Sequence, residues 1–164
     1  MTLLALSLGS NIDRQKHLQF AIDGLHALLG ELGISPVYET RAVGFDGPDF
    51  YNLVVLADTQ LPLDDLIERI RKIETAAGRI RGEKRFASRN LDIYVLLYGD
   101  ANLREQGRDI PRREIEHAAY VLKPLADVLP QGAHPISGIG FAQMWADYRD
   151  DNQSPIQVAF APTV

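Results

Sequence analysis

Apolar residues repeat with two different periods along this chain, and the order in which the periods alternate limits the available folds. A period of two predicts a strand, and a period of about 3.6 predicts a helix. The segments follow in the order strand 2–8, helix 18–29, strand 34–40, strand 51–57, helix 62–73 and strand 91–98. This βαββαβ order predicts an α+β fold with a ferredoxin-like core and an antiparallel sheet. Short helices between residues 112 and 148 are expected to pack around that core.

The composition is typical of a globular domain. Of the 164 residues, 46% are hydrophobic and 24% are charged, and no cysteine is present. Disulfides and thiolate metal sites are therefore excluded. The apolar run 1–8 is too short for a membrane span and lacks the basic flank of a signal peptide. We expect a cytoplasmic, monomeric enzyme with a single domain over residues 1–150, a loose tail at 151–164, and no membrane contact.

A cluster of cations is conspicuous because the chain as a whole is acidic, with a net charge of −5 and a pI near 5.3. That overall charge argues against nucleic acid as a partner, which needs a basic surface. Within segment 79–89, however, there are five cations: Arg79, Arg81, Lys84, Arg85 and Arg89. Arginine forks bind phosphate oxygens bidentately, so this pattern is typical of a polyphosphate site. A solvated surface loop explains the same composition equally well.

Two further groups of residues fit small-molecule chemistry. Asp92 follows the cations on a strand and suits magnesium, which takes one or two carboxylates together with substrate phosphates. A hydrogen-bonding role at the strand end is the simpler explanation for one aspartate. A flat heteroaromatic ligand needs aromatic faces and hydrogen bonds at its edge, and candidates for these are Thr40, Phe50, Asn52, Phe86 and Tyr120. Taken alone, the three aromatic residues are better explained as core residues.

Several segments of the chain together resemble one enzyme family. They read LSLGSNI, VYET, VGFDGPDFYNLVV, IETAAGRIRGEKRFASRNLDIYVLLYGD, IPRREIEHAAYVLKPLADVLP and HPISG, and they span roughly residues 2–148. The family is 6-hydroxymethyl-7,8-dihydropterin pyrophosphokinase. The resemblance implies a three-layer α/β/α enzyme that binds ATP and two magnesium ions, and then hydroxymethyldihydropterin. It implies transfer of diphosphate from ATP to the pterin, with release of AMP, in folate biosynthesis.

The resemblance also assigns roles by position. The pterin pocket would be lined by Thr40, Val43, Phe50 and Asn52, with stacking rings from Phe86 and Tyr120. ATP would contact Glu74, Arg79, Arg81, Arg85, Arg89, Arg112 and Arg113. Catalysis would depend on Arg79 and Arg89, which stabilise charge on the migrating diphosphate, and on the metal ligand Asp92. Segment 81–86 would close over the site as a lid.

The chain departs from the family pattern at the metal site. The family has Asp-x-Asp, with both carboxylates on one strand face, but the second position here is Tyr94. An ordinary phenol is neutral at pH 7 and is a poor magnesium ligand, so the second of the two magnesium sites is in question. Arg112 stands where the family usually has a histidine, and Ala118 stands where it has an arginine. Because the arginine at position 118 is missing, Arg112 or Arg113 is expected to restore a positive charge near the phosphates. Phe86 replaces the usual tryptophan and keeps an aromatic face.

Three functions are open on these observations. The segments above favour an active pyrophosphokinase, whereas Tyr94 favours a pterin- and nucleotide-binding relative that has lost efficient catalysis. The third is an RNA-binding module on the same core, which needs exposed aromatic residues on its central strands and a basic sheet face. The strand segments NLVVLA and LDIYVLL are mostly aliphatic and the chain is acidic, which argues against RNA binding.

Overall fold

The structure, a computed structural model, describes residues 1–42, 46–78, 90–150 and 154–164. Its strands are β1 (Thr2–Ser10), β2 (Gly33–Ile34), β3 (Tyr38–Thr40), β4 (Phe50–Thr59), β5 (Asp92–Tyr98) and β6 (Ile156–Gln157). Its α-helices are α1 (Arg14–Leu29), α2 (Leu63–Ala76), α3 (Ala119–Val128) and α4 (Phe141–Asp147). Two short 3₁₀ helices, η1 (Arg104–Gln106) and η2 (Arg113–Glu116), connect β5 to α3.

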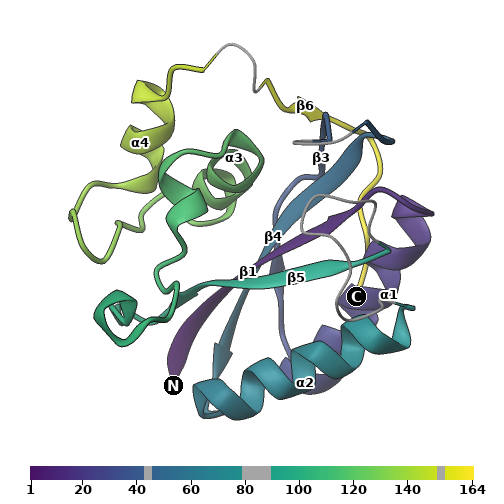
Figure 1. Cartoon of the computed structure of the whole chain (residues 1–164), viewed down its shortest axis with the longest axis horizontal. Coiled ribbons are helices and arrows are strands. Elements are labelled where there is room, and N and C mark those ends of the chain that lie inside the picture. The colour runs from purple at the N-terminus through teal and green to yellow at the C-terminus, as the bar shows by residue number, and fades with distance from the viewer. Residues whose placement is uncertain (43–45, 79–89, 151–153) are drawn as a thin grey trace.

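The strands form one antiparallel sheet in the order β5-β1-β4-β3-β6, with β2 also paired to β4 (Figure 1). The strand β1 therefore lies between β4 and β5, although it precedes both in the sequence. Its residues from Leu4 onward are buried, because strands cover both of its edges and helices both of its faces. This arrangement confirms the predicted ferredoxin-like core.

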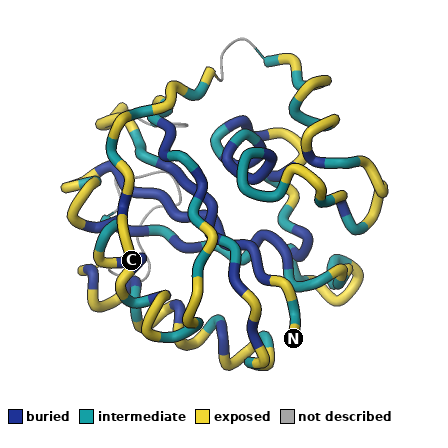
Figure 2. The backbone as a smooth tube through the Cα atoms, turned by 180° about the vertical axis from the view of Figure 1, so that it is seen from behind, coloured by how far each residue is buried: buried dark blue, intermediate teal, exposed yellow. Residues whose placement is uncertain are grey.

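Helices cover the two faces of the sheet separately (Figures 1 and 2). Against α1 and α2 the sheet packs a core that includes Leu4, Leu6, Leu8, Leu53 and Val55. Against α3 and α4 it packs a second core that includes Ala5, Val54, Leu96 and Leu97. The two sets alternate along β1 and β4, as side chains of a strand point to opposite faces in turn. On β5 the consecutive Leu96 and Leu97 share the second core, where the pairing of β5 with β1 has an irregularity. The predicted three-layer α/β/α arrangement is confirmed.

The predicted strand 34–40 is two short strands, β2 and β3, because Pro36 has no N–H to donate to a ladder. Ser35 repairs the interruption: its backbone N–H donates to Val54 O, and its hydroxyl accepts the Val54 N–H at 2.8 Å. The predicted strand 2–8 also extends further, since Gly9 and Ser10 still belong to β1. Both differences are local and leave the sheet order unchanged.

The prediction of a loose tail after residue 150 is wrong for residues 154–164. Strand β6 pairs with β3, and the Val158 N–H donates to Val37 O. The ring of Phe160 stacks on Tyr51 with centroids 6.2 Å apart. The polar composition of the tail concealed this packing, because the few apolar residues that it contributes have no periodicity. Within the described residues, no helix is both long and apolar enough to cross a bilayer.

Candidate active site

Two of the predicted site residues, Asn52 and Asp92, lie in one cross-strand row of the sheet. Gly9 of β1 pairs with Asn52 of β4 on one side and with Asp92 of β5 on the other. Residues paired in this way share a face. Val54, two residues after Asn52, packs in the core beneath α3, so the row also faces the α3 side. Two interstrand spacings, about 10 Å, separate the outer members of the row.

Glycine at position 9 allows the Asn52 side chain to lie close to the backbone of β1. A Cβ built on Gly9 would lie 2.9 Å from Asn52 Oδ1 and 3.8 Å from Phe50 Cδ1. Any side chain at this position would therefore press on the Asn52 amide. The strand thus brings two polar residues to the same face of the sheet, one on each side of a residue without a side chain.

Three of the residues predicted to bind a pterin lie together on β3 and β4, namely Thr40, Phe50 and Asn52. Thr40 pairs with Phe50 across the two strands. Asn52 Nδ2 donates to Thr40 Oγ1 at 2.9 Å, so the amide is fixed with Oδ1 towards Gly9. The buried Asn11 donates through Nδ2 to Pro48 O at 3.0 Å and ties the β3–β4 loop to the end of β1. Sequence analysis does not predict this contact, because 37 residues separate its two partners.

On the β5 side, Tyr94 lies two residues beyond Asp92 and so on the same face of the strand. The Arg112 guanidinium carbon lies 3.8 Å from the centroid of the Tyr94 ring. Arg112 Nε in turn donates to Glu114 Oε1 at 2.6 Å, and the Tyr120 hydroxyl donates to Glu114 Oε2. Burial, followed by the charge of Glu114, raises the pKa of Tyr120 above its ordinary value. Tyr120 is therefore a protonated donor at neutral pH.

Glu114 is the second residue that sequence interpretation missed. It joins the predicted phosphate-binding Arg112 to the predicted stacking residue Tyr120. A carboxylate placed two residues after an arginine was the available signal, but it predicts only a local ion pair. The link to Tyr120 depends on how η2 and α3 are placed relative to each other, and local sequence does not reveal this.

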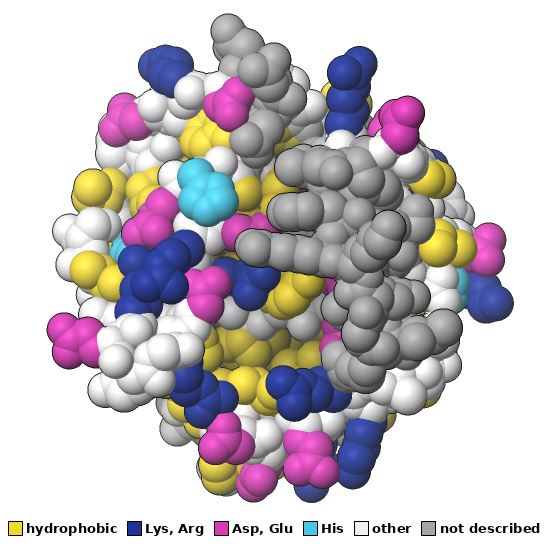
Figure 3. Space-filling model, viewed as in Figure 1, with side chains coloured by type: hydrophobic (Ala, Val, Ile, Leu, Met, Phe, Trp, Pro, Cys, Tyr) yellow, Lys and Arg dark blue, Asp and Glu magenta, His cyan; other side chains and the backbone are white. Residues whose placement is uncertain are grey.

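A pocket of about 370 Å³ opens beside the outer edge of β5. It is lined by α2 residues on one side, by Ile93, Tyr94 and Val95 of β5, and by residues 107–110 and Arg112 on the other side. Figure 3 shows this face hollowed, with hydrophobic side chains at the floor and Lys or Arg side chains at the rim. An apolar floor with a basic rim suits a flat base that carries phosphates.

The structure puts Glu74 in the wall of this pocket and Arg113 outside its lining. Glu74 is only 3% exposed, and its Oε2 accepts the Ile93 N–H at 2.9 Å, so it secures α2 to the edge of β5. Arg113 Nη1 lies 3.4 Å from Asp109 Oδ1. Arg108 Nη1 lies 2.7 Å from Asp64 Oδ1 and links the loop at 107–110 to the start of α2.

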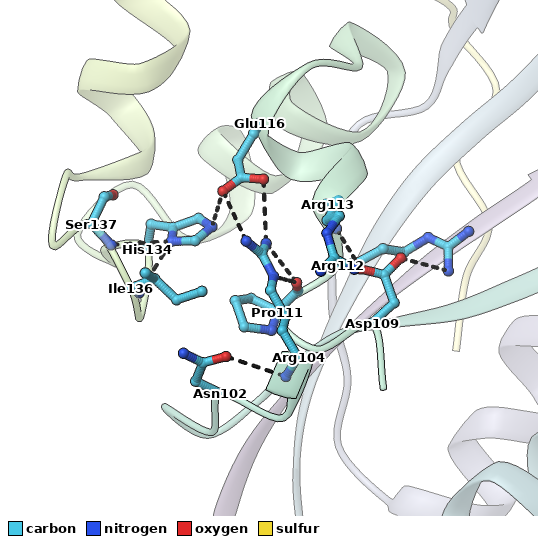
Figure 4. Close-up of polar contacts among 10 residues, drawn as sticks. All are labelled: Asn102, Arg104, Asp109, Pro111, Arg112, Arg113, Glu116, His134, Ile136 and Ser137. Atoms are coloured by element: carbon cyan, nitrogen blue, oxygen red, sulfur yellow. Dashed lines mark hydrogen bonds and ion pairs between the residues drawn. The ribbon is translucent and has the colours of Figure 1, made fainter. Parts of the chain in front are cut away.

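A polar network holds the segment that carries Arg112 (Figure 4). Arg104 donates to Pro111 O at 3.0 and 2.8 Å and to Glu116 at 3.3 Å. Nδ1 of the buried His134 accepts the N–H groups of Ile136 and Ser137, so its proton lies on Nε2. His134 Nε2 lies 3.3 Å from Glu116 Oε1, without the alignment of a hydrogen bond. The Arg112 N–H also donates to Leu96 O.

The remaining predicted residues, namely Val43, Arg79, Arg81, Arg85, Phe86 and Arg89, lie outside the described residues. In the described part of the chain, no group of three or more His, Asp or Glu side chains could hold a metal ion. A lone carboxylate can still fit magnesium, because this ion usually keeps several waters and binds substrate phosphates. Asp92 therefore fits one ion that arrives with a nucleotide.

Comparison with protein families gives one match over most of the chain. Residues 5–130 match the model of the family described as 7,8-dihydro-6-hydroxymethylpterin-pyrophosphokinase. A 2-amino-4-hydroxy-6-hydroxymethyldihydropteridine pyrophosphokinase of Aquifex aeolicus is 35% identical over 138 residues, covering 83% of this chain and 86% of its own length. A protein of the same name from Methylorubrum extorquens is 38% identical over 134 residues, covering 79% of this chain and 84% of its own.

Solved structures agree on the fold. A crystal structure of a Plasmodium falciparum HPPK-DHPS triple mutant matches 90% of this chain with a TM-score of 0.70 at 14% sequence identity. The wild-type protein of that organism matches with a TM-score of 0.68 at 15% identity. This chain spans less than half of those longer chains, 43% and 44% respectively. At these identities the likeness is one of fold.

Proposed function

The chain belongs to the 7,8-dihydro-6-hydroxymethylpterin pyrophosphokinase family, and from this premise we propose that it transfers diphosphate from ATP to 6-hydroxymethyl-7,8-dihydropterin in folate biosynthesis. The products are AMP and the pterin diphosphate. One observation carries the proposal: Asn52 and Asp92, predicted to bind acceptor and metal respectively, flank Gly9 on one face of the sheet. An acceptor and a polyphosphate bound at the two ends of this row would meet over Gly9.

The acceptor is assigned to the β3–β4 side of the row. An amide has both a donor and an acceptor, which matches the edge of a pterin, and Asn52 is fixed in orientation by Thr40. Phe50 lies beside Gly9 on the same face of the sheet. Phe86 and Val43 remain predictions for the rest of the pocket, with Tyr120 as a further stacking residue.

The nucleotide is assigned to the pocket beside β5. Arg112 lines this pocket and Asp92 begins the strand that forms its inner wall. Arg79, Arg81, Arg85 and Arg89 enter the sequence shortly before Asp92, so they are proposed to bind the phosphates from the same end of β5. Glu74 would contact the nucleotide from α2.

The proposed chemistry is an in-line displacement. The hydroxyl oxygen of the pterin forms a bond to the β-phosphorus of ATP, the bond between that phosphorus and the α,β-bridging oxygen breaks, and AMP leaves with that oxygen. The hydroxyl proton passes to solvent. Arg79 and Arg89 would stabilise the charge of the migrating diphosphate, so catalysis is by positioning and electrostatics. Magnesium held by Asp92 would supply further neutralisation of phosphate charge.

A binding protein without efficient catalysis is the second candidate, and the tyrosine at position 94 is the observation behind it. The relatives that are named pyrophosphokinases, at 35% and 38% identity, favour the enzyme. The two candidates differ in one measurable product. Only the enzyme forms AMP from ATP when hydroxymethyldihydropterin and magnesium are present.

The test is an AMP-release assay on wild type, Asp92→Asn and Asp58→Asn. Asp58 is an exposed strand aspartate near the opposite end of β4 and is the matched control. We expect pterin-dependent AMP release by wild type and Asp58→Asn, and a loss of about 100-fold or more for Asp92→Asn, since a ligand of a charge-stabilising metal is removed. Tight pterin binding without AMP release at any magnesium concentration would establish the binding protein instead.

A further inference from the structure

The pair formed by Tyr94 and Arg112 lies beside the proposed metal ligand. Tyr94 shares a strand face with Asp92, and the Arg112 guanidinium covers the Tyr94 ring at 3.8 Å. This distance is well within the range at which the negative face of an aromatic ring attracts a cation. A guanidinium, which is positively charged at every physiological pH, is therefore fixed two residues along the strand from Asp92.

The donor set around Tyr94 does not fit a second magnesium ion. Magnesium takes oxygen ligands in a tight octahedron. Position 94, two residues after Asp92, offers a phenol in place of a carboxylate. The ring face is already covered by a positive charge. A dication placed here would be repelled by Arg112, and position 94 itself offers no carboxylate to offset the loss of its water shell.

Arg112 is well placed to act on phosphates itself. Its Nε is held by Glu114 at 2.6 Å, and its backbone N–H by Leu96 O at 3.0 Å. Within the described part of the chain, Nη1 and Nη2 make no hydrogen bond, and Nη1 lies 3.9 Å from Asp109. The Arg112 side chain lines the pocket beside β5. The Arg112 guanidinium is therefore held in the wall of the pocket that is assigned to the nucleotide.

We propose that the Arg112 guanidinium, held on the Tyr94 ring, takes the place of a second divalent ion, so that this chain binds ATP with a single magnesium ion. The inference rests on the proposed function, because it concerns the same nucleotide site. Arg112 is then a phosphate-binding residue, and Tyr94 is a positioning residue that acts through Arg112. The hydroxyl of Tyr94 has no part in metal binding.

The test counts metal ions without measuring turnover. Manganese replaces magnesium, a nonhydrolysable α,β-methylene analogue of ATP replaces the nucleotide, and electron paramagnetic resonance measures free and bound Mn²⁺ during a titration. Wild type is expected to bind one Mn²⁺ per chain in the presence of the analogue. Two ions of comparable affinity per chain, with a spin-coupled signal, would overturn the proposal.

Two single variants test the contributions of the Tyr94 hydroxyl and of the Arg112 guanidinium one at a time. Tyr94→Phe keeps the stack and is expected to keep the count at one and the analogue affinity unchanged. Loss of the bound ion in Tyr94→Phe would show that the hydroxyl is a ligand, contrary to the proposal. Arg112→Ala is expected to weaken analogue binding by roughly tenfold to a hundredfold, the value of a charge-assisted hydrogen bond. The control is Arg69→Ala, at an exposed position of α2, with no expected change.

The double variant Tyr94→Asp/Arg112→Ala tests whether a second metal ion can take the place of the Arg112 guanidinium. With a carboxylate restored and the guanidinium removed, it is expected to bind two Mn²⁺ per chain and to recover analogue affinity relative to Arg112→Ala. A count that stays at one with no recovery contradicts the proposed exchange; if the double variant does not fold, the wild-type and Tyr94→Phe counts decide. If wild type does not bind the analogue at all with Mn²⁺, the proposed function itself has failed.

Discussion

The Asn52 amide is oriented by its neighbour, because Nδ2 donates to Thr40 Oγ1 and Oδ1 consequently faces Gly9. Asp92, at the other end of the row, occupies the first position of an edge strand. What distinguishes the two residues is that the register of three strands puts them in one row. At the scale of single residues, the proposed function therefore depends on the Asn52 amide and the Asp92 carboxylate at the two ends of the row.

Changing the Asn52 amide to a carboxylate should impair pterin binding specifically. Asn52→Asp keeps the shape of the side chain but removes its donor, so we expect KM for the pterin to rise about tenfold to a hundredfold. KM for ATP should change little. Steady-state AMP-release kinetics with each substrate varied measures both. Asn102→Asp, at an exposed position where the side-chain oxygen accepts the Arg104 N–H, is the control; equal rises in both KM values would refute the assignment.

His134 should make stability depend on pH. Burial chiefly lowers its pKa below 6.5; Arg104 lowers it further, while Glu116 opposes the shift. The folded state therefore resists protonation, and the stability that neutral His134 contributes is lost as pH falls below 6.5. Urea denaturation at pH 7.5 and 5.5 should show a decrease, at most about 1.4 kcal/mol per pH unit from this group.

His134→Asn keeps an acceptor for the N–H groups of Ile136 and Ser137 and cannot be protonated in this range. Its stability should fall less between the two pH values than that of wild type. His117→Asn, at an exposed position, should retain the wild-type dependence. An unchanged pH dependence in His134→Asn would show that other groups cause the decrease.

At the scale of elements, strand β6 and the residues after it secure the β3–β4 end of the sheet. Phe160 stacks on Tyr51, and on that same Tyr51 ring lies the Arg14 guanidinium at 3.8 Å. Arg14 Nη1 also pairs with Glu39 Oε2 of β3 at 2.6 Å. The backbone of Thr163 makes two hydrogen bonds with the Gln19 side chain of α1. The segment thus joins α1, β3 and β4 next to Thr40 and Phe50.

Removal of the Phe160 ring should lower stability although the residue lies in the tail. For Phe160→Ala we expect a loss of about 1–2 kcal/mol, because a partly buried ring and a stacked pair are lost. Ile156→Ala, whose side chain is 66% exposed, should change stability by less than about 0.5 kcal/mol. Urea denaturation followed by circular dichroism measures both. Equal stability of Phe160→Ala and wild type would mean that this packing contributes nothing in solution.

At the scale of the whole molecule, one sheet belongs to two hydrophobic cores. Leu53 packs towards α1 and α2, and its neighbour Val54 packs towards α3 and α4. If the strands separate on one face of the sheet, the apolar side chains of the core on the other face also become exposed to water. The molecule should therefore unfold as one cooperative unit, which is the behaviour expected of the single domain predicted over residues 1–150.

The single tryptophan, Trp145, provides the measurement of cooperativity. It lies on α4 in the α3–α4 layer, whereas far-ultraviolet circular dichroism reports on all elements. We expect urea transitions followed by the two signals to coincide in wild type and in Val54→Ala, with the midpoint of the variant lowered because a buried side chain is truncated. An earlier fluorescence transition would show that the α3–α4 layer unfolds on its own.

The sequence predicted much of the core but less of the site. Apolar periodicity located β1, β4, β5, α1 and α2, because each of these elements has a buried face of its own. Periodicity could not reveal β6, whose two residues are both exposed. Nor could it pair Gly9 with both Asn52 and Asp92, or place Glu114 between Arg112 and Tyr120. Such contacts arise from strand register and helix placement, to which distant parts of the chain contribute.

The place of Gly9 between Asn52 and Asp92 has a consequence for how the proposed enzyme could change during evolution. If the two substrates bind at the two ends of this row, the spacing between neighbouring β-strands sets the distance between them. That spacing hardly differs from one protein to another. Mutation can therefore adjust which molecules are held, through the loops at either end, but it can scarcely adjust how far apart they are held. Gly9→Ala tests this spacing directly, since one methyl group would stand where the two reactants have to meet.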